Sequence, residues 1–137
     1  MHDSPATQAA AESQQTLDNE HLVQLGLADA VVQSVEEGAS AEEVQQLVAQ
    51  FVDYTELHFM SEQLLMRLHA YPDYDEHVAD HEAIVEALRA LRESTAGGEA
   101  SPLTAERAHK LKGQMLGHIR NRDAALHAFI DELKHGN

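Results

Sequence analysis

The chain has 137 residues, a length typical of one domain with a single core. Nine basic and 24 acidic side chains give it a formal net charge of −15 at pH 7, which disfavours binding to nucleic-acid phosphates or anionic membrane surfaces. The absence of cysteine excludes disulfides, thiol nucleophiles and metal clusters held by thiolates. Ten histidines in a cysteine-free chain are therefore its most unusual compositional feature.

The N-terminal residues 1–16 are rich in Ala, Gln and Ser and show no amphipathic period. We expect them to form a flexible arm, which leaves residues 17–137 as the folded domain. Residues 1–15 contain no Lys or Arg and no continuous apolar run, unlike a secretory signal. Apolar runs elsewhere are far shorter than the ~20 residues that span a bilayer. These features favour a soluble, cytoplasmic protein.

Three breaks, at residues 37–40, 70–73 and 94–102, divide the domain into four segments. Each segment repeats apolar residues every three or four positions, which is typical of an amphipathic α-helix. The expected end signals are a glycine after the first segment, a capping box that opens the second, and a proline in the first turn of the third and the fourth. These residues are Gly38, Ser40 with Glu43, Pro72, and Ser101 with Pro102. Short connections between long helices favour antiparallel neighbours, so we predict an all-α, up-down-up-down antiparallel four-helix bundle.

Polar residues interrupt the apolar stripes that should face the core of this bundle. The stripe of the second segment includes Thr55, His58 and Glu62, and that of the third includes His77 and His81. In the fourth segment, the residues on or near one face are Leu111, Met115, His118, Ile119, Arg122, Leu126, Phe129 and Leu133. Ionisable side chains at core positions are costly without partners, so these residues need an explanation.

Two of the polar pairs have the spacing of bidentate metal ligands. His58 and Glu62, like His77 and His81, are four residues apart and share one face of a helix. His118 and Asp123 are five residues apart, and an α-helix would turn their side chains about 140° away from each other. That separation is poor for a single metal ion, but it allows the carboxylate to reach sideways between two ions.

With a histidine from the first segment, every segment contributes to a set of five imidazoles and two carboxylates. The candidate metal ligands are His21, His58, Glu62, His77, His81, His118 and Asp123. Such donors suit first-row transition metals, iron in particular. Two Fe²⁺, two carboxylates and one hydroxide leave a net charge of only about +1, which favours a buried pair of ions over one. The other histidines are expected to be structural or solvated: His2, His69, His109, His127 and His135.

The chain resembles the hemerythrin family, and its bacteriohemerythrin members in particular, from about residue 17 to residue 133. The resemblance rests on four motifs: Leu17 to His21, Tyr54 to Met66 with His58-Phe59 and Glu62, His77-Val-Ala-Asp-His81, and His118-Ile119 to Asp123. It implies a non-haem di-iron site, with an oxo or hydroxo bridge, that binds O₂ reversibly. It further implies that His77, His81 and His118 hold one iron, that His21 and His58 hold the other, and that Glu62 and Asp123 bridge them. The second iron would keep an open position for O₂, in a pocket poor in proton donors; we expect Phe59 and Ile119 to line it.

The sequence departs from the family in lacking tryptophan and in having Gln63 where a second glutamate often follows the metal-binding one. Neither departure touches an expected ligand, but both bear on the packing around the site. Three functions stay open: a non-enzymatic O₂-binding protein for storage, delivery or sensing; a di-iron enzyme with oxidase, peroxidase or NO-related activity; and a sensory module of a longer signalling protein. Ferritin-like di-iron enzymes use more carboxylates, so the histidine-rich set favours O₂ binding without catalysis over turnover. NO and peroxide are the alternative ligands.

Overall fold

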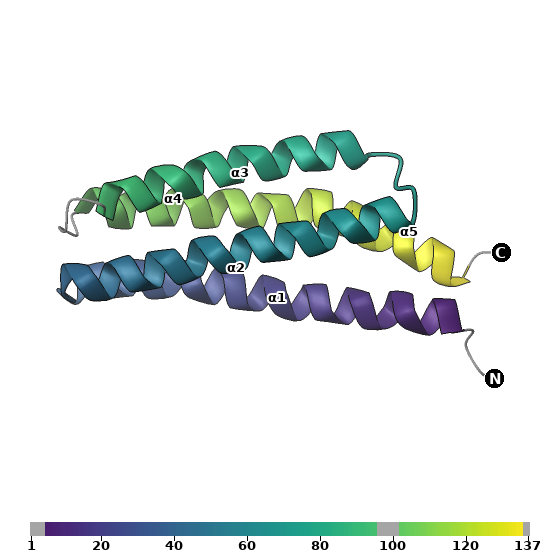
Figure 1. Ribbon diagram of the computed structural model, residues 1–137, viewed down its shortest axis with the longest axis horizontal. Helices are drawn as coiled ribbons and strands as arrows, with labels where there is room; N and C mark the ends of the chain where they lie inside the picture. The colour runs from purple at the N-terminus through teal and green to yellow at the C-terminus, as the bar shows by residue number, and fades with distance from the viewer. Residues whose placement is uncertain (1–4, 96–101, 136–137) are drawn as a thin grey trace.

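The computed structural model describes residues 5–95 and 102–135, which form helices, short connections at 37–40 and 69–73 and, in this part of the chain, no strand. The first three helices are α1 (Pro5–Glu36), α2 (Ala41–Leu68) and α3 (Tyr74–Thr95). The fourth rod is α4 (Pro102–His118), continued by the π-helical turn η1 (Ile119–Asp123) and by α5 (Ala124–His135). Successive rods run in opposite directions, and each packs against two neighbours (Figure 1). The predicted up-down-up-down four-helix bundle is confirmed.

Three of the predicted helix-end signals are present as expected, and one of them is Pro102, the first residue of α4. The first helix ends at Glu36, and Gly38 follows with φ of 76°, a left-handed conformation that glycine adopts without strain. Ser40 caps α2, because its hydroxyl oxygen accepts a hydrogen bond of 3.2 Å from the backbone N–H of Glu43. The third helix begins at Tyr74, just after Pro72 rather than with it, and the predicted cap Ser101 lies outside the described residues.

The first helix begins earlier than the periodicity predicts. It starts at Pro5 and runs unbroken through the residues expected to open the bundle near position 17. Proline is favourable in the first turn of a helix, and the Ala, Gln and Glu residues that follow have high helix propensity. Because of this propensity, the first helix extends toward the N-terminus beyond its packed part without needing an apolar stripe there. The flexibility of residues 1–16 stays a prediction, and residues 1–4 lie outside the described part.

The polar residues that interrupt the stripes lie between two apolar clusters. The larger cluster draws on all four rods and includes Val48, Phe51, Leu88 and Leu111. The smaller one consists of Leu65, Met66, Tyr71, Leu126 and Ile130. Burial of each large apolar side chain stabilises the fold by about 1.5–3 kcal/mol, so these clusters offset the cost of the polar section between them.

The buried face of the fourth rod changes its helical phase at η1. The α-helical pattern places Arg122 and Leu133 on the buried face, but the Arg122 side chain is 42% exposed and Leu133 is 44% exposed. Asp123 and Ile130 are buried instead. A π-helical turn closes hydrogen bonds between residues five apart, so it advances the buried face by one residue. The predicted positions of Arg122 and Leu133 are therefore wrong for this reason.

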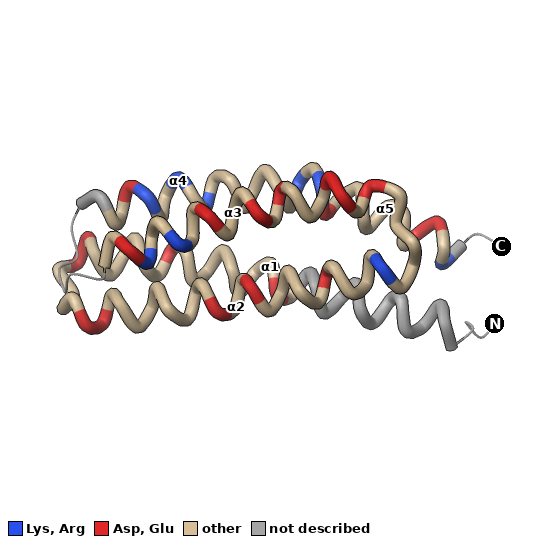
Figure 2. The backbone as a smooth tube through the Cα atoms, turned by 45° about the horizontal axis from the view of Figure 1, so that its top comes forward, with Lys and Arg blue, Asp and Glu red and all other residues tan. Residues whose placement is uncertain are grey.

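Acidic residues are spread along the coloured part of every rod, with the fewer basic residues scattered among them (Figure 2). Among the described residues, no helix is both long enough and apolar enough to cross a membrane.

Candidate metal centre

All seven predicted ligands come together inside the bundle, and all are buried. Their donor atoms form two groups, in each of which the atoms lie within 4.8 Å of one another. The larger group is Glu62, His77, His81, His118 and Asp123; the smaller is His21, His58, Glu62 and Asp123. Because the two carboxylates belong to both groups, the centre consists of a three-histidine side and a two-histidine side that share Glu62 and Asp123.

Helical spacing explains how α2 and α3 present their donors. His58 Nε2 lies 3.4 Å from Glu62 Oε2, as expected for residues one turn apart. His77 and His81 also lie one turn apart on α3, with ring centroids separated by 4.7 Å. Their Nε2 atoms lie 2.5 Å and 2.8 Å from Glu62 Oε1. Both predicted four-residue pairs therefore point into the same space.

The fourth rod presents His118 and Asp123 together through its π-helical turn. In an α-helix, residues five apart point about 140° away from each other. Here η1 separates them, and His118 Nε2 lies 3.0 Å from Asp123 Oδ1. The expected sideways reach of the carboxylate is not needed, because a π turn brings residues five apart onto one face. Such turns occur frequently at functional sites.

Each carboxylate directs one oxygen to each side of the centre. Glu62 Oε1 faces the three-histidine side, whereas Oε2 lies 3.4 Å from His58 Nε2 and 3.6 Å from His21 Nε2. Asp123 Oδ1 lies 3.1 Å from His77 Nε2, and its Oδ2 lies 2.8 Å from His21 Nε2. This arrangement is the one expected of carboxylates that bridge two metal ions.

Several buried nitrogen and oxygen atoms that could bind a metal at the centre lack a hydrogen bond. They are His21 Nε2, His58 Nε2, Glu62 Oε2 and both carboxylate oxygens of Asp123. These atoms are close together, yet their angles do not suit hydrogen bonds, because they point at common spaces rather than at one another. Buried polar atoms without partners are costly. Cations in those spaces would satisfy all of them, so the residues present fit a pair of metal ions.

The carboxylates strongly perturb the imidazoles around them. Burial lowers the pKa of His118, but its contacts with Asp123 and Glu62 outweigh that effect and raise the pKa to about 10. The pKa of His21 rises to about 9 for the same reasons. Burial raises the pKa of Asp123, but close contacts with the imidazoles of His118, His21 and His77 lower it to about 2. Without metal, the positive charge of protonated imidazoles thus balances the negative charge of the carboxylates, and metal binding would displace those protons.

Three ligand histidines are held through their outer ring nitrogens by side chains from a neighbouring helix. His58 Nδ1 lies 2.5 Å from Glu20 Oε2, and His118 Nδ1 lies 2.5 Å from Asp80 Oδ2. His81 Nδ1 lies 3.2 Å from Gln63 Oε1. Such partners fix the tautomer and orientation of a ligand imidazole. The sequence does not reveal the roles of Glu20 and Asp80, since each sits beside one ligand in the chain but contacts another.

Two further aromatic rings adjoin the centre. The ring of Phe59 stacks on His81, with centroids 3.9 Å apart and planes 7° apart, and its expected role in lining the pocket of the second iron stays a prediction. The ring of His127, a histidine expected to be structural or solvated, stacks on that of His21 with the two centroids 6.0 Å apart. Ile119 is half-buried on η1, and its role in a dry pocket stays a prediction. Of the other histidines, His109 is exposed and His69 half-exposed, whereas His2 and the His135 side chain lie outside the described part.

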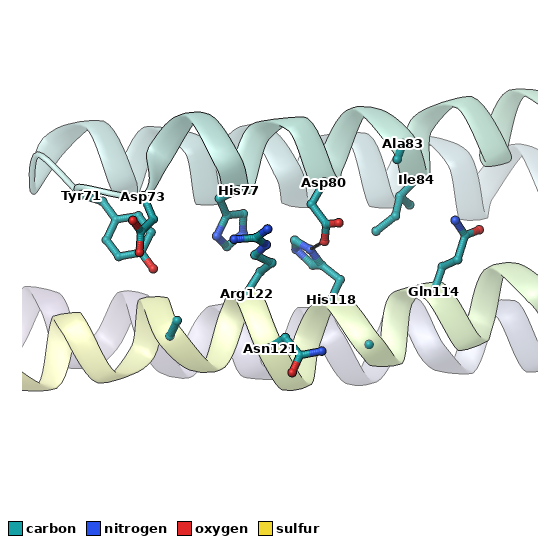
Figure 3. A pocket seen from close by; sticks show the side chains of 12 residues that line it. Tyr71, Asp73, His77, Asp80, Ala83, Ile84, Gln114, His118, Asn121 and Arg122 are labelled. Carbon is teal, nitrogen blue, oxygen red and sulfur yellow. Dashed lines mark hydrogen bonds and ion pairs between the residues drawn. The ribbon is translucent and has the colours of Figure 1, made fainter.

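Two clefts approach the three-histidine side from the surface. One, of about 470 Å³, lies between α3 and the fourth rod and is lined by both His77 and His118 (Figure 3). Asp80 reaches across this cleft to His118. The other, of about 580 Å³, lies between α2 and α3 and is lined by Phe59, Gln63 and His81. Neither cleft is lined by His21 or His58, so the two-histidine side lies away from both.

The comparisons with known proteins agree with this geometry. The profile of the family described as Hemerythrin HHE cation binding domain matches residues 13–130. The match includes all seven residues of the centre. Searches among curated proteins and among solved structures gave no match.

Proposed function

The chain belongs to the hemerythrin HHE cation-binding family, and on this basis we propose that it binds O₂ reversibly at a pair of non-haem irons, for storage, delivery or sensing. The observation that carries the proposal is the unequal division of histidines between two sides that share both carboxylates. A site with equal sides would offer no preferred place for an added ligand. This one has three histidines on one side and two on the other.

We assign His77, His81 and His118 to one iron and His21 and His58 to the other, with Glu62 and Asp123 bridging. The direction of the carboxylate oxygens supports this assignment, since each residue faces one oxygen to either side. Imidazole and carboxylate donors suit iron among the first-row metals. The two-histidine side has one protein donor fewer, which leaves room for a small ligand there.

When bound, the two irons would supply the electrons that hold O₂ and recover them when it leaves. The protein's own contribution is to position the donors and to exclude water. Glu20 and Asp80 accept the outer ring protons of His58 and His118 and so hold both imidazoles in one tautomer. The apolar clusters on both sides of the centre limit access of water and protons. The proposal includes no catalytic residue and no substrate turnover.

The test is to load the metal-free protein anaerobically with Fe²⁺, measure iron per chain, and follow the visible spectrum while O₂ is admitted and then removed. We expect two irons per chain and charge-transfer bands that appear with O₂ and disappear without it. Bands that form once and do not reverse would count against O₂ binding and favour oxidase or peroxidase chemistry at the same centre.

A further inference from the structure

One complete layer of the bundle lies next to the centre, on the side of the larger apolar cluster. Its four residues are each three positions from a ligand histidine, about 4.5 Å along the helix axis. Gln24 follows His21, Thr55 precedes His58, Ile84 follows His81 and Met115 precedes His118. Since successive rods are antiparallel, these steps all lead toward the same end (Figure 1). The four side chains are between 0% and 2% exposed.

Half of this layer is polar, and one polar atom of each residue in that half lacks a hydrogen-bond partner. The amide nitrogen of Gln24 and the hydroxyl oxygen of Thr55 are buried, and neither has a hydrogen bond. Ile84 and Met115 occupy the other half, as expected for a core layer. An unsatisfied buried polar group destabilises a fold, so two of them in one layer call for a function.

The polar half lies beside the two-histidine side of the centre. Gln24 is on the same helix as His21, and Thr55 is on the same helix as His58. The two helices are in register here, because the rings of His21 and His58 meet edge to face with centroids 4.7 Å apart. The apolar half is on α3 and the fourth rod, above the three-histidine side. The unpartnered donors therefore lie on the side that has room for a small ligand.

We propose that Gln24 and Thr55 form a hydrogen-bonding site for a small, negatively charged ligand held next to His21 and His58. The inference rests on the proposed function and deepens it, because it assigns residues that would stabilise the ligand. An amide N–H and a hydroxyl donate hydrogen bonds but are very weak acids. They stabilise negative charge in a dry site without delivering a proton to it. A reversible site needs this combination, because a protonated ligand would leave as peroxide.

The experiment compares the parent chain with Gln24→Leu and Thr55→Val, which keep the approximate shape of each side chain and remove its donor. Azide is the probe, as a small anion that accepts hydrogen bonds, and it is titrated into the oxidised, iron-loaded protein. We expect each substitution to raise the azide Kd about 10-fold, the effect of losing one hydrogen bond to a charged group. Iron content should not change. Met115→Leu, in the apolar half of the same layer, is the matched control and should bind azide like the parent.

A second measurement uses the metal-free chain, in which no ligand can compensate for the buried donors. There, Gln24→Leu and Thr55→Val should raise the melting temperature by a few degrees, because each removes an unsatisfied polar group. Azide binding equal to that of the parent in both variants would overturn the inference, and so would a lower melting temperature in both. Azide binding that depends on Gln24, in a protein that does not release O₂, would instead count against the proposed function alone.

Discussion

His118 and Asp123 face each other across a π-helical turn, with His118 Nε2 3.0 Å from Asp123 Oδ1. The turn places a carboxylate, rather than the neighbouring Arg122, in the interior of the bundle. It also brings the fourth rod's two donors onto one face, although they are five residues apart. The centre therefore depends on a local departure from α-helical geometry.

The first prediction compares Asp123, which the π-helical turn buries, with Arg122, which the turn leaves partly exposed. Asp123→Ala should lower iron binding at both metal positions, which share this carboxylate, and destabilise the metal-free chain by about 1–3 kcal/mol, because His21 and His118 lose their buried carboxylate partner. Arg122→Ala should leave iron content unchanged, since that side chain is partly exposed and its ion pair is with Glu76, 3.6 Å away. Iron analysis and thermal unfolding of both variants would check this. If Arg122→Ala lost iron and Asp123→Ala did not, the fourth rod would have to be α-helical at residues 119–123.

The second prediction concerns the pH dependence of the metal-free chain. The pKa of His118, raised to about 10, and that of His21, raised to about 9, exceed the ordinary value of 6.5. Both groups therefore stabilise the fold fully below pH 6.5, and this contribution is lost as the pH rises toward 10. The pKa of Asp123 is lowered from 3.8 to about 2, so its contribution is lost as the pH falls through that range. His81 has the opposite effect on stability, because burial lowers its pKa below the ordinary value.

Stability of the metal-free chain should thus be greatest between about pH 4 and 6.5 and should decline from pH 7 to pH 10. Melting temperatures measured across this range would check the prediction. The variant His118→Ala should show a shallower decline at high pH, whereas His109→Ala, an exposed histidine, should follow the parent. A parent whose melting temperature rises from pH 7 to pH 10 would contradict the assigned protonation.

The amphipathic period of each segment was sufficient to predict the bundle, and the four-residue spacings were sufficient to predict that His58 pairs with Glu62 and His77 with His81. Each of these patterns lies within a single helix, and the regular geometry of an α-helix fixes which of its residues share a face. The π turn could not be predicted, because a prediction from periodicity uses the same number of residues per turn along the whole helix. Contacts between helices, such as Asp80 with His118, depend on how the rods rotate and slide against each other. For the same reason, nothing in the sequence distinguishes Gln24 from a solvated residue.

The third prediction concerns the carboxylate that orients His118 from outside. Asp80 Oδ2 lies 2.5 Å from His118 Nδ1, so Asp80→Asn should weaken binding of the iron on the three-histidine side by about 10- to 100-fold. Equilibrium titration with Fe²⁺ in the presence of a competing chelator would measure this change. Glu76→Gln is the control, because Glu76 lies on the same helix but is exposed. Equal affinities in both variants would show that Asp80 does not support its imidazole partner.

The last prediction concerns Glu62, the residue on which both sides of the centre converge. Its two oxygens lie within 3.6 Å of all five ligand imidazoles, and contacts with His118, His21, His58 and His77 keep its pKa well below 4.5 despite burial. Glu62→Gln keeps the shape of the side chain but removes the charge and replaces one acceptor oxygen by a donor. Because both metal positions share this carboxylate, the variant should lose both irons together, whereas loss of a ligand such as His58 should affect mainly one position. Glu56→Gln, on the same helix but only half-buried, should retain the parent's iron content. Iron measured per chain after anaerobic loading decides between these outcomes: one iron retained in Glu62→Gln would mean that the two sides bind metal independently and that Glu62 does not bridge them.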